Sequence, residues 1–485
     1  MPGSSSISSS LTWKFFERFS VQIVQFIVSI VIARILLPEQ YGVMAILNIF
    51  IIISSSIVQS GLGQYLIQKE SIGNKDYSVV LFCSLMLAII LYVLLFVTAP
   101  LISLFFKMPE LTGMLRILSL VLFITAFSSV QMAYIRRNML FRNLTSASLI
   151  SAICSGLAGV FCALKGAGTW SLIVQQLVYH LITPAILLFT VNWKPSLSWD
   201  KAIAEHSFSF GIKLLVADLV DRLYHSLENV IVGRVYSKDT LAFFDRGKQF
   251  PLILIDNVDG SVQSVIYPAY SRLQNDQAAM KGLLGRSIRM STFLSFLSMA
   301  TLLVVATPLI HVLLGDKWMP AVPFLQAYCI ITMLFPFQTA LLQAFIAKGE
   351  GKVYFYLTLI KRVIGAILLI SVVFLFDSVF AIVWTCLVIE LVGVAINLIP
   401  ARKHLGYGVK DMIRDVIPNL LIAVVVVAAG LWFEKLFSNP LISLSLTGIL
   451  SLVIIVVMSF AMNNESYNTI CEKLHLEKYL CRRSR

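Results

Sequence analysis

Long apolar runs alternate with short polar connections along nearly the whole chain. The runs are continuous and about twenty residues or longer, which is the length of helix that crosses the hydrocarbon core of a bilayer. A transmembrane β-barrel would instead show short segments of alternating polarity. The pattern predicts an all-α membrane protein with about fourteen transmembrane helices. These are expected near residues 13–36, 41–64, 77–99, 112–135, 144–164, 168–191, 207–232, 241–268, 287–310, 321–346, 353–376, 378–400, 413–432 and 440–462.

The composition agrees with a multi-pass membrane protein. Of the 485 residues, 58% are hydrophobic and only 13% are charged, and the mean hydropathy is +0.87. A soluble protein this apolar would not have enough polar residues to cover its surface. The net charge of +13 is explained by the Lys and Arg that cytoplasmic loops collect. We therefore expect a membrane as the surroundings and no nucleic-acid partner.

The cationic residues are divided unequally between alternate connections. One set is rich in Lys and Arg and includes Lys69, Lys75, Arg136, Arg137, Arg142, Lys348, Lys352 and the terminal Arg482-Arg483-Ser484-Arg485. The other set holds only Arg34, Lys107, Lys165, Arg234, Lys238, Lys317 and Lys435. By the positive-inside rule the first set is cytoplasmic. Both termini are then cytoplasmic, in agreement with an even number of spans.

Two short blocks indicate an internal repeat. Residues 34–42 and 234–242 both read Arg, an acid five residues on, an apolar residue and then a small one, at an offset of 200 residues. Pro100-Leu101-Ile102 and Pro308-Leu309-Ile310 repeat at an offset of 208. Two six-span halves of this kind are parallel repeats about an axis along the membrane normal, as in many transporters. The predicted domains are an N-terminal lobe (1–200), a C-terminal lobe (201–405), two extra helices (406–462) and a cytoplasmic tail (463–485). Arg34 and Arg234 are expected to pair with Glu39 and Asp239, or to belong to an external gate.

The first of these blocks also carries a family resemblance. Residues 13–18 and 32–42, above all the Ala-Arg-x-Leu-x-Pro-x-x-Tyr-Gly block at 33–42, resemble the polysaccharide transport branch of the multidrug/oligosaccharidyl-lipid/polysaccharide exporter superfamily, the Wzx-like flippases. Gly61-Leu62-Gly63 fits the same pattern. The resemblance implies a MATE-like bundle of two lobes around a central cavity, in the bacterial inner membrane. It implies the flipping of undecaprenyl-diphosphate-linked oligosaccharides by alternating access for surface polysaccharide synthesis. A polysaccharide polymerase and a chain-length regulator are the partners it implies.

The charged stripe of the seventh span is the main candidate site. Asp218, Asp221, Arg222, His225 and Glu228 fall on one face of a helix within an apolar run. Charges at this depth cost a few kcal/mol each, so they face water or a partner. One interpretation is a structural network in which Asp218 pairs with Arg222 at i+4. The other is a hydrated site, where Arg222 contacts phosphate or sugar, His225 assists, and the acids Asp218, Asp221 and Glu228 carry a proton or Na⁺.

Other charged or polar residues in the spans complete the set of candidates. Lys14, Arg18 and Gln25 lie on one face of the first span, and Arg18 either anchors at the interface or binds the diphosphate of a lipid carrier. Lys213 and Arg246 join the substrate-binding candidates, and Asp256 and Asp259 of the eighth span join the ion-coupling candidates. Lys361 and Arg362 are expected either to anchor the eleventh span at the cytoplasmic side or to contact substrate.

Several signatures are missing from the sequence. It has no Walker-type Gly-x-x-x-x-Gly-Lys-Ser/Thr and no Gly-x-Ser-x-Gly, and its seven cysteines form no Cys-x-x-Cys pair. We expect a transporter without catalytic residues, metal or cofactor, coupled to an H⁺ or Na⁺ gradient. An H⁺- or Na⁺-coupled multidrug antiporter on the same fold remains the alternative, and a membrane polymerase or glycosyltransferase is a more distant one.

Overall fold

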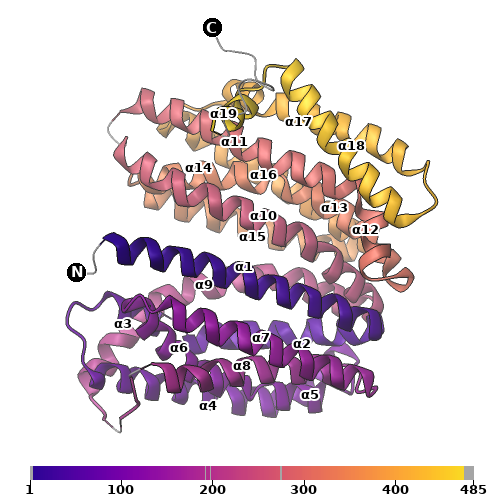
Figure 1. Ribbon diagram of the computed structural model, residues 1–485. Helices are drawn as coiled ribbons and strands as arrows, with labels where there is room; N and C mark the ends of the chain where they lie inside the picture. The colour runs from indigo at the N-terminus through magenta and orange to yellow at the C-terminus, as the bar shows by residue number, and fades with distance from the viewer. Residues whose placement is uncertain (1–3, 60, 192, 197, 274–275, 474–485) are drawn as a thin grey trace. The chain divides into compact units, whose positions relative to one another are not determined.

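The computed structural model describes residues 4–59, 61–191, 193–196, 198–273 and 276–473. Every regular element in these ranges is helical. The chain divides into two compact units, Met1–Ala242 and Phe243–Arg485 (Figure 1). Of residues 4–18, 213, 214, 217 and several residues in 261–267, the structure describes the helical backbone alone.

The first unit consists of long helices joined by short turns. They are α1 (Ser4–Ile35), α2 (Pro38–Gln59), α3 (Leu62–Gln68), α4 (Asn74–Phe106), α5 (Leu111–Leu118), α6 (Val121–Arg137), α7 (Phe141–Leu164), α8 (Trp170–Thr190) and α9 (Lys201–Val235). α10 (Lys238–Arg272) begins at the end of this unit and continues into the second.

The second unit continues the same pattern with more broken helices. Its elements are α11 (Gln277–Val304), α12 (Ala306–Leu313), the 3₁₀ helix η1 (Asp316–Ala321), α13 (Val322–Thr332), α14 (Phe335–Ala347), α15 (Gly351–Leu375), α16 (Val379–His404), α17 (Val409–Glu434), α18 (Pro440–Ala461) and α19 (Glu465–Lys473). In this unit α11 packs against α13, α14, α17 and α18, and α15 packs against α16.

Among the described residues, 11 helical segments are long and apolar enough to cross a membrane. They coincide in order with eleven of the expected spans, which confirms a multi-pass helical membrane protein. The other three expected spans are α1, α9 and α10, helices of 32, 35 and 35 residues. The described apolar part of α1, Phe19–Ile35, is shorter than the rest, and α9 and α10 carry the charged stripes. A total of fourteen spans therefore stays a prediction.

Small residues let the helices of the first unit approach closely. α7 packs against both α1 and α8, and its buried positions are mostly Ala, Ser, Thr and Gly. A Cβ at Gly156 would lie 2.4 Å from Cγ2 of Val28 on α1. In a bilayer the hydrophobic effect does not drive helices together, so close van der Waals packing at small residues is what stabilises their contact.

The two repeated blocks form matching turns that touch each other. α1 ends at Ile35 and α2 begins at Pro38, while α9 ends at Val235 and α10 begins at Lys238, at the same offset of 200 residues. A Cβ at Gly42 would lie 2.1 Å from the backbone oxygen of Lys238. Because no side chain fits there, glycine is the residue that lets the start of α2 meet the second turn.

Charged residues near these turns have other partners than expected. The expected pair of Arg234 with Asp239 is not formed in the part of the chain that the structure describes. The guanidinium of Arg234 instead lies 5.1 Å from the ring centroid of Phe105. Lys238 forms an ion pair with Glu110, in the connection before α5. An aromatic face attracts a cation, so the ring of Phe105 is a favourable neighbour for Arg234.

The position of α9 differs from that of the other helices assigned to the second lobe. It packs against α2, α3 and α4 of the first unit, whereas the repeat assigns it to the lobe 201–405. The lobe boundaries at residues 200 and 405 therefore stay a prediction.

Candidate functional site

The charged face of α9 forms as the helical period predicts. Nε of Arg222 donates to Oδ2 of Asp218 at 2.8 Å, and the hydroxyl of Ser56 on α2 donates to the same oxygen. Nε2 of His225 lies 3.6 Å from Oδ2 of Asp221. The side chains of Asp218 and Arg222 are 49% and 43% exposed. The pairing expected of a structural network and the exposure expected of a hydrated site are thus both present.

This geometry suits the recognition of an anion. Arg222 binds Asp218 through Nε, so this bond leaves the two terminal nitrogens of the planar group available. A guanidinium offers paired, charge-assisted bonds to phosphate oxygens. Ser56 donates to Asp218, and Asp218 in turn accepts from Nε of Arg222, so the guanidinium is oriented by a partner that is itself hydrogen-bonded. Glu228 is half-buried further along the same helix.

Three predicted substrate-binding side chains lie outside the described residues. Lys14 and Arg18 belong to α1 and Lys213 belongs to α9, but only their backbone is described. Gln25 is described and exposed on α1. Their roles stay predictions.

The acids of α10 occupy two different environments. Asp256 is exposed, whereas Asp259 is partly buried. Oδ2 of Asp259 accepts from Thr339 on α14 at 3.0 Å and from Gln263 at 2.9 Å, and Gln343 donates to Oε1 of Gln263 at 3.1 Å. Oδ1 of Asp259 is buried and has no hydrogen-bond partner among the described residues. A buried carboxylate oxygen without a donor is costly, which keeps Asp259 as an ion-coupling candidate.

Arg246 is buried, although it was predicted to bind substrate. Its side chain is 7% exposed, Nη1 donates to Oε1 of Gln249 at 2.7 Å, and the guanidinium lies 5.6 Å from the ring centroid of Trp318. In this position the side chain fills the interior of the second unit and leaves little surface for a substrate.

A polar hub on α14 was not predicted. The amide oxygen of Gln338 accepts from Nζ of Lys361 at 3.1 Å and from Asn397 at 3.0 Å, and its amide nitrogen donates to Oε2 of Glu390 at 2.5 Å. Lys361 therefore joins α15 to α14 inside the helix bundle. Its ammonium group was expected instead at the cytoplasmic interface or in contact with substrate. The sequence feature that could have predicted this hub is a set of three polar residues within one apolar run: Gln338, Thr339 and Gln343.

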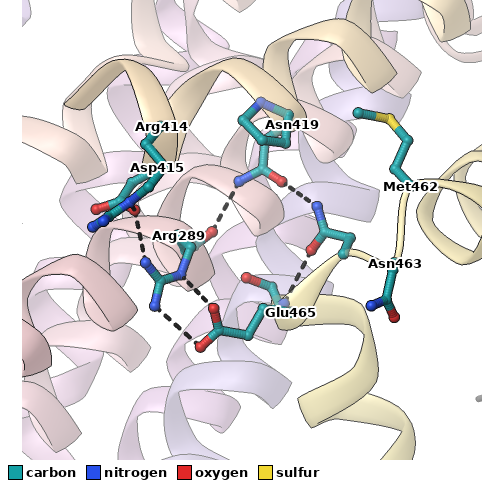
Figure 2. Close-up of a pocket in the computed structure, with 10 residues that line it drawn as sticks. Arg289, Arg414, Asp415, Asn419, Met462, Asn463 and Glu465 are labelled. Atoms are coloured by element: carbon teal, nitrogen blue, oxygen red, sulfur yellow. Dashed lines mark hydrogen bonds and ion pairs between the residues drawn. The ribbon is translucent and has the colours of Figure 1, made fainter. Parts of the chain in front are cut away.

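A polar pocket lies where α11, α17 and the connection from α18 to α19 meet (Figure 2). Its volume is about 460 Å³. Nη1 of Arg289 donates to Oδ1 of Asp415 at 2.7 Å, and Nη2 donates to Oε1 of Glu465 at 3.0 Å. The lining residues are Arg289, Arg414, Asp415, Pro418, Asn419, Met462, Asn463, Asn464, Glu465 and Ser466. The two arginines and two acids pair with each other, so the pocket lacks the excess positive charge that a diphosphate needs.

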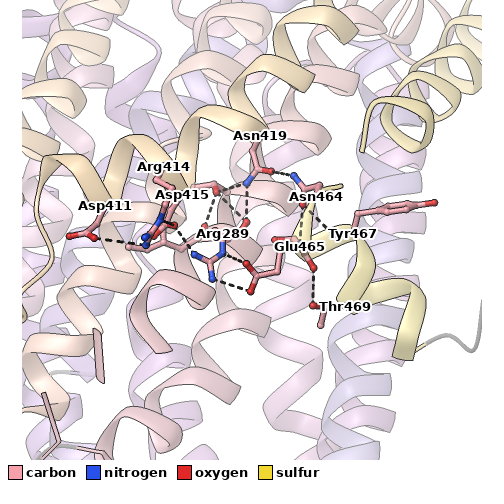
Figure 3. A network of polar contacts seen from close by, with 12 residues as sticks. Arg289, Asp411, Arg414, Asp415, Asn419, Asn464, Glu465, Tyr467 and Thr469 are labelled. Carbon is pink, nitrogen blue, oxygen red and sulfur yellow. Dashed lines mark hydrogen bonds and ion pairs between the residues drawn. The ribbon is translucent and has the colours of Figure 1, made fainter. Parts of the chain in front are cut away.

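The same residues belong to a larger network (Figure 3). The side-chain amide of Asn419 donates to the backbone oxygen of Arg289 at 3.0 Å and to Thr292 at 2.9 Å. Asn464 donates to Asn419 at 2.8 Å. The sequence did not reveal this network, because each residue read alone looks like an ordinary polar group near a helix end. The sequence feature that could have predicted the network is the pair Asp415 and Asn419, which lie four residues apart on an otherwise apolar helix.

Among the described residues, no group of three or more His, Cys, Asp or Glu could hold a metal ion. The face of α9 presents partly exposed charges within an apolar run, and Asp259 has a buried carboxylate oxygen without a hydrogen-bond partner among the described residues. These two sets are the best placed for an anionic substrate and for a coupling ion, respectively.

Comparisons with known proteins identify the family and the fold of the chain. A family model described as "Polysaccharide biosynthesis protein" matches residues 31–323. The chain is 24% identical over 430 residues to the succinoglycan biosynthesis transport protein ExoT of Rhizobium meliloti (strain 1021), a match that covers 87% of this chain and 86% of that protein.

Solved structures show the same fold. The inward closed conformation of the lipid II flippase MurJ matches with a TM-score of 0.76 at 15% identity, over 96% of this chain and 100% of that one. The inward-facing conformation of a multidrug resistance MATE family transporter matches with a TM-score of 0.62 at 16% identity, over 79% of this chain and 94% of that one. These likenesses confirm the predicted MATE-like helical fold.

Proposed function

Because the chain belongs to the polysaccharide biosynthesis protein family of Wzx-like flippases, we propose that it translocates undecaprenyl-diphosphate-linked oligosaccharide units across the bacterial inner membrane. The units would serve the synthesis of a surface polysaccharide: O-antigen, capsule or exopolysaccharide. Transport would proceed by alternating access, with both termini in the cytoplasm. The similarity to a succinoglycan transport protein supports a transport role over a catalytic one.

One observation carries the proposal: Arg222 lies half-exposed and oriented on a helix of membrane-spanning length. A diphosphate loses strong hydration when it leaves water, and that cost is large in a low-dielectric environment. Paired hydrogen bonds from a fixed guanidinium offset part of the cost. Asp218 supports this role by holding Nε of Arg222, so that its terminal nitrogens are the ones presented to phosphate.

The acids have a separate role in the proposal. Asp221 and Glu228 lie on the same helix as Arg222, where carboxylates accept hydrogen bonds from glycan hydroxyl groups. Asp259, with its unpaired oxygen, would bind and release H⁺ or Na⁺ and so couple export to an ion gradient. A polysaccharide polymerase and a chain-length regulator would act on the exported units.

The test compares a strain that lacks this protein with strains that carry single variants. The deletion strain should accumulate lipid-linked repeat units on the cytoplasmic side. Arg222→Ala should abolish export while its amount in the membrane stays normal. Lys201→Ala is the matched control, because Lys201 also forms an exposed i,i+4 pair on α9, with Glu205, but lies outside the apolar run.

Normal export by the Arg222→Ala variant would overturn the assignment of the site. Normal export by the deletion strain, with no redundant exporter, would overturn the function. Altered drug resistance of the deletion strain without accumulation of lipid-linked sugar would instead favour the multidrug antiporter.

A further inference from the structure

The short helix α19 is tied by polar side chains to two helices that precede it in the second unit. Glu465 at its first turn meets Arg289 on α11 through two contacts, Nη2 to Oε1 at 3.0 Å and Nε to Oε2 at 3.0 Å. Asn464 meets Asn419 on α17 at 2.8 Å. We propose that α19 is a releasable strap, which binds to this end of α11 and α17 and forms one wall of the pocket (Figure 2).

The two ion pairs of Arg289 differ in a way that allows release. The inner partner, Asp415, has a side chain that is 0% exposed, whereas the outer partner, Glu465, is 59% exposed. A buried ion pair is costly to break because it leaves a charge without compensation. An exposed pair is weak and is screened by salt. The outer pair is therefore the one that opens.

Release leaves no buried charge unpaired. When Glu465 departs, Arg289 keeps its bond to Asp415 at 2.7 Å. Asp415 also keeps the hydroxyl of Tyr407 at 3.2 Å and Nε of Arg414 at 3.2 Å. These remaining partners come from α11, from α17 and from Tyr407 just before α17, so α19 can bind to this group of residues or leave it.

The connection before α19 has the form of a hinge followed by a cap. Asn463 has a φ of 49°, a left-handed conformation that asparagine tolerates better than most residues and that often ends a helix. Oδ1 of Asn464 accepts from the backbone nitrogens of Ser466 and Tyr467 at 3.0 and 3.3 Å, as a helix N-cap does. The chain therefore turns sharply after α18 and starts a new helix, whose first residue is the one that binds Arg289.

A native cysteine reports the position of α19. Cys471 lies on this helix and is 3% exposed, so its thiol is accessible only when α19 leaves its site. Labelling of the full chain in detergent with a maleimide, with the rate at Cys471 measured by mass spectrometry of its peptide, follows release directly. Cys83, which is buried on α4, reports global unfolding in the same sample.

Glu465→Gln should raise the labelling rate at Cys471 by up to about fivefold, the change expected from loss of one exposed ion pair, with Cys83 unlabelled. Added salt should raise the rate in the unmodified protein and have a smaller effect in the variant. Glu472→Gln is the matched control, because Glu472 is an exposed acid on the same helix and should leave the rate unchanged. Equal labelling rates at Cys471 in the Glu465→Gln variant and the unmodified protein would contradict the proposed release of α19. Labelling of Cys83 in parallel with Cys471 would contradict it too.

Discussion

The face of α9 and the network around Arg289 contain the same residue types with opposite surroundings. Each pairs an Asp with an Arg in a helix of membrane-spanning length. Asp218 and Arg222 are four residues apart on one helix and about half-exposed. Asp415 and Arg289 come from different helices, and the acid is fully buried. The comparison teaches that exposure decides the role: the open pair remains available to a ligand, whereas the buried pair holds helices together.

The largest effect should follow from breaking the buried pair. Arg289→Met removes the guanidinium that neutralises Asp415, and loss of one partner from a buried pair destabilises a protein by about 3–5 kcal/mol. Thermal unfolding of the purified variant should show a large fall in Tm. The double variant Arg289→Met/Asp415→Asn should recover much of it, because no buried charge is then left alone. A fall in stability below about 1 kcal/mol would show that the pair is not structural.

The exposed Asp218–Arg222 pair should matter little for stability and much for export. Arg222→Ala should change the free energy of unfolding by at most about 1 kcal/mol, since exposed pairs contribute little, although we expect export to be lost. The same unfolding measurement on both variants makes the contrast direct. If Arg222→Ala destabilises the protein as much as Arg289→Met does, the face of α9 is a structural network and the proposed substrate contact fails.

A third pair, intermediate in position, should give the smallest effect. Burial by itself would raise the pKa of Glu110, but the hydrogen bond and charge of Lys238, together with a backbone hydrogen bond, lower the pKa below its usual value of 4.5. A lowered carboxyl pKa adds stability above the pKa of the unfolded chain, and this stability is lost as the pH falls through the folded value. The Tm difference between the protein and its Glu110→Gln variant should therefore shrink as the pH is lowered from 6 toward about 3. A difference that stays constant over this range would contradict the pairing.

Much of the helical framework was predictable because it depends on local pattern. The apolar runs predicted eleven spans that the structure contains, and the 3.6-residue period placed Asp218 and Arg222 on one face. The repeated blocks predicted two equivalent turns, and α1–α2 and α9–α10 break at equivalent residues. Each of these inferences needs only neighbouring residues and the cost of exposing backbone groups to lipid.

The partners of individual side chains were less predictable. Arg246 was expected to face a substrate but packs against Trp318. Lys361 was expected at an interface or in contact with substrate but donates to Gln338. A long cationic side chain can reach an interface, an acid, an amide or an aromatic ring, and the sequence does not rank these choices when the neighbours come from other helices.

The sequence by itself determined that this protein is a multi-pass helical membrane protein with charges on one face of α9, since span length and helical period are properties of short segments. Only the tertiary structure decided which charges are buried. Arg289 and Glu465 are 176 residues apart, and their contact depends on how α11, α17 and the end of α18 pack. Burial and ion pairing are set by that packing, because the free energy of a charge depends on every group that replaces its water.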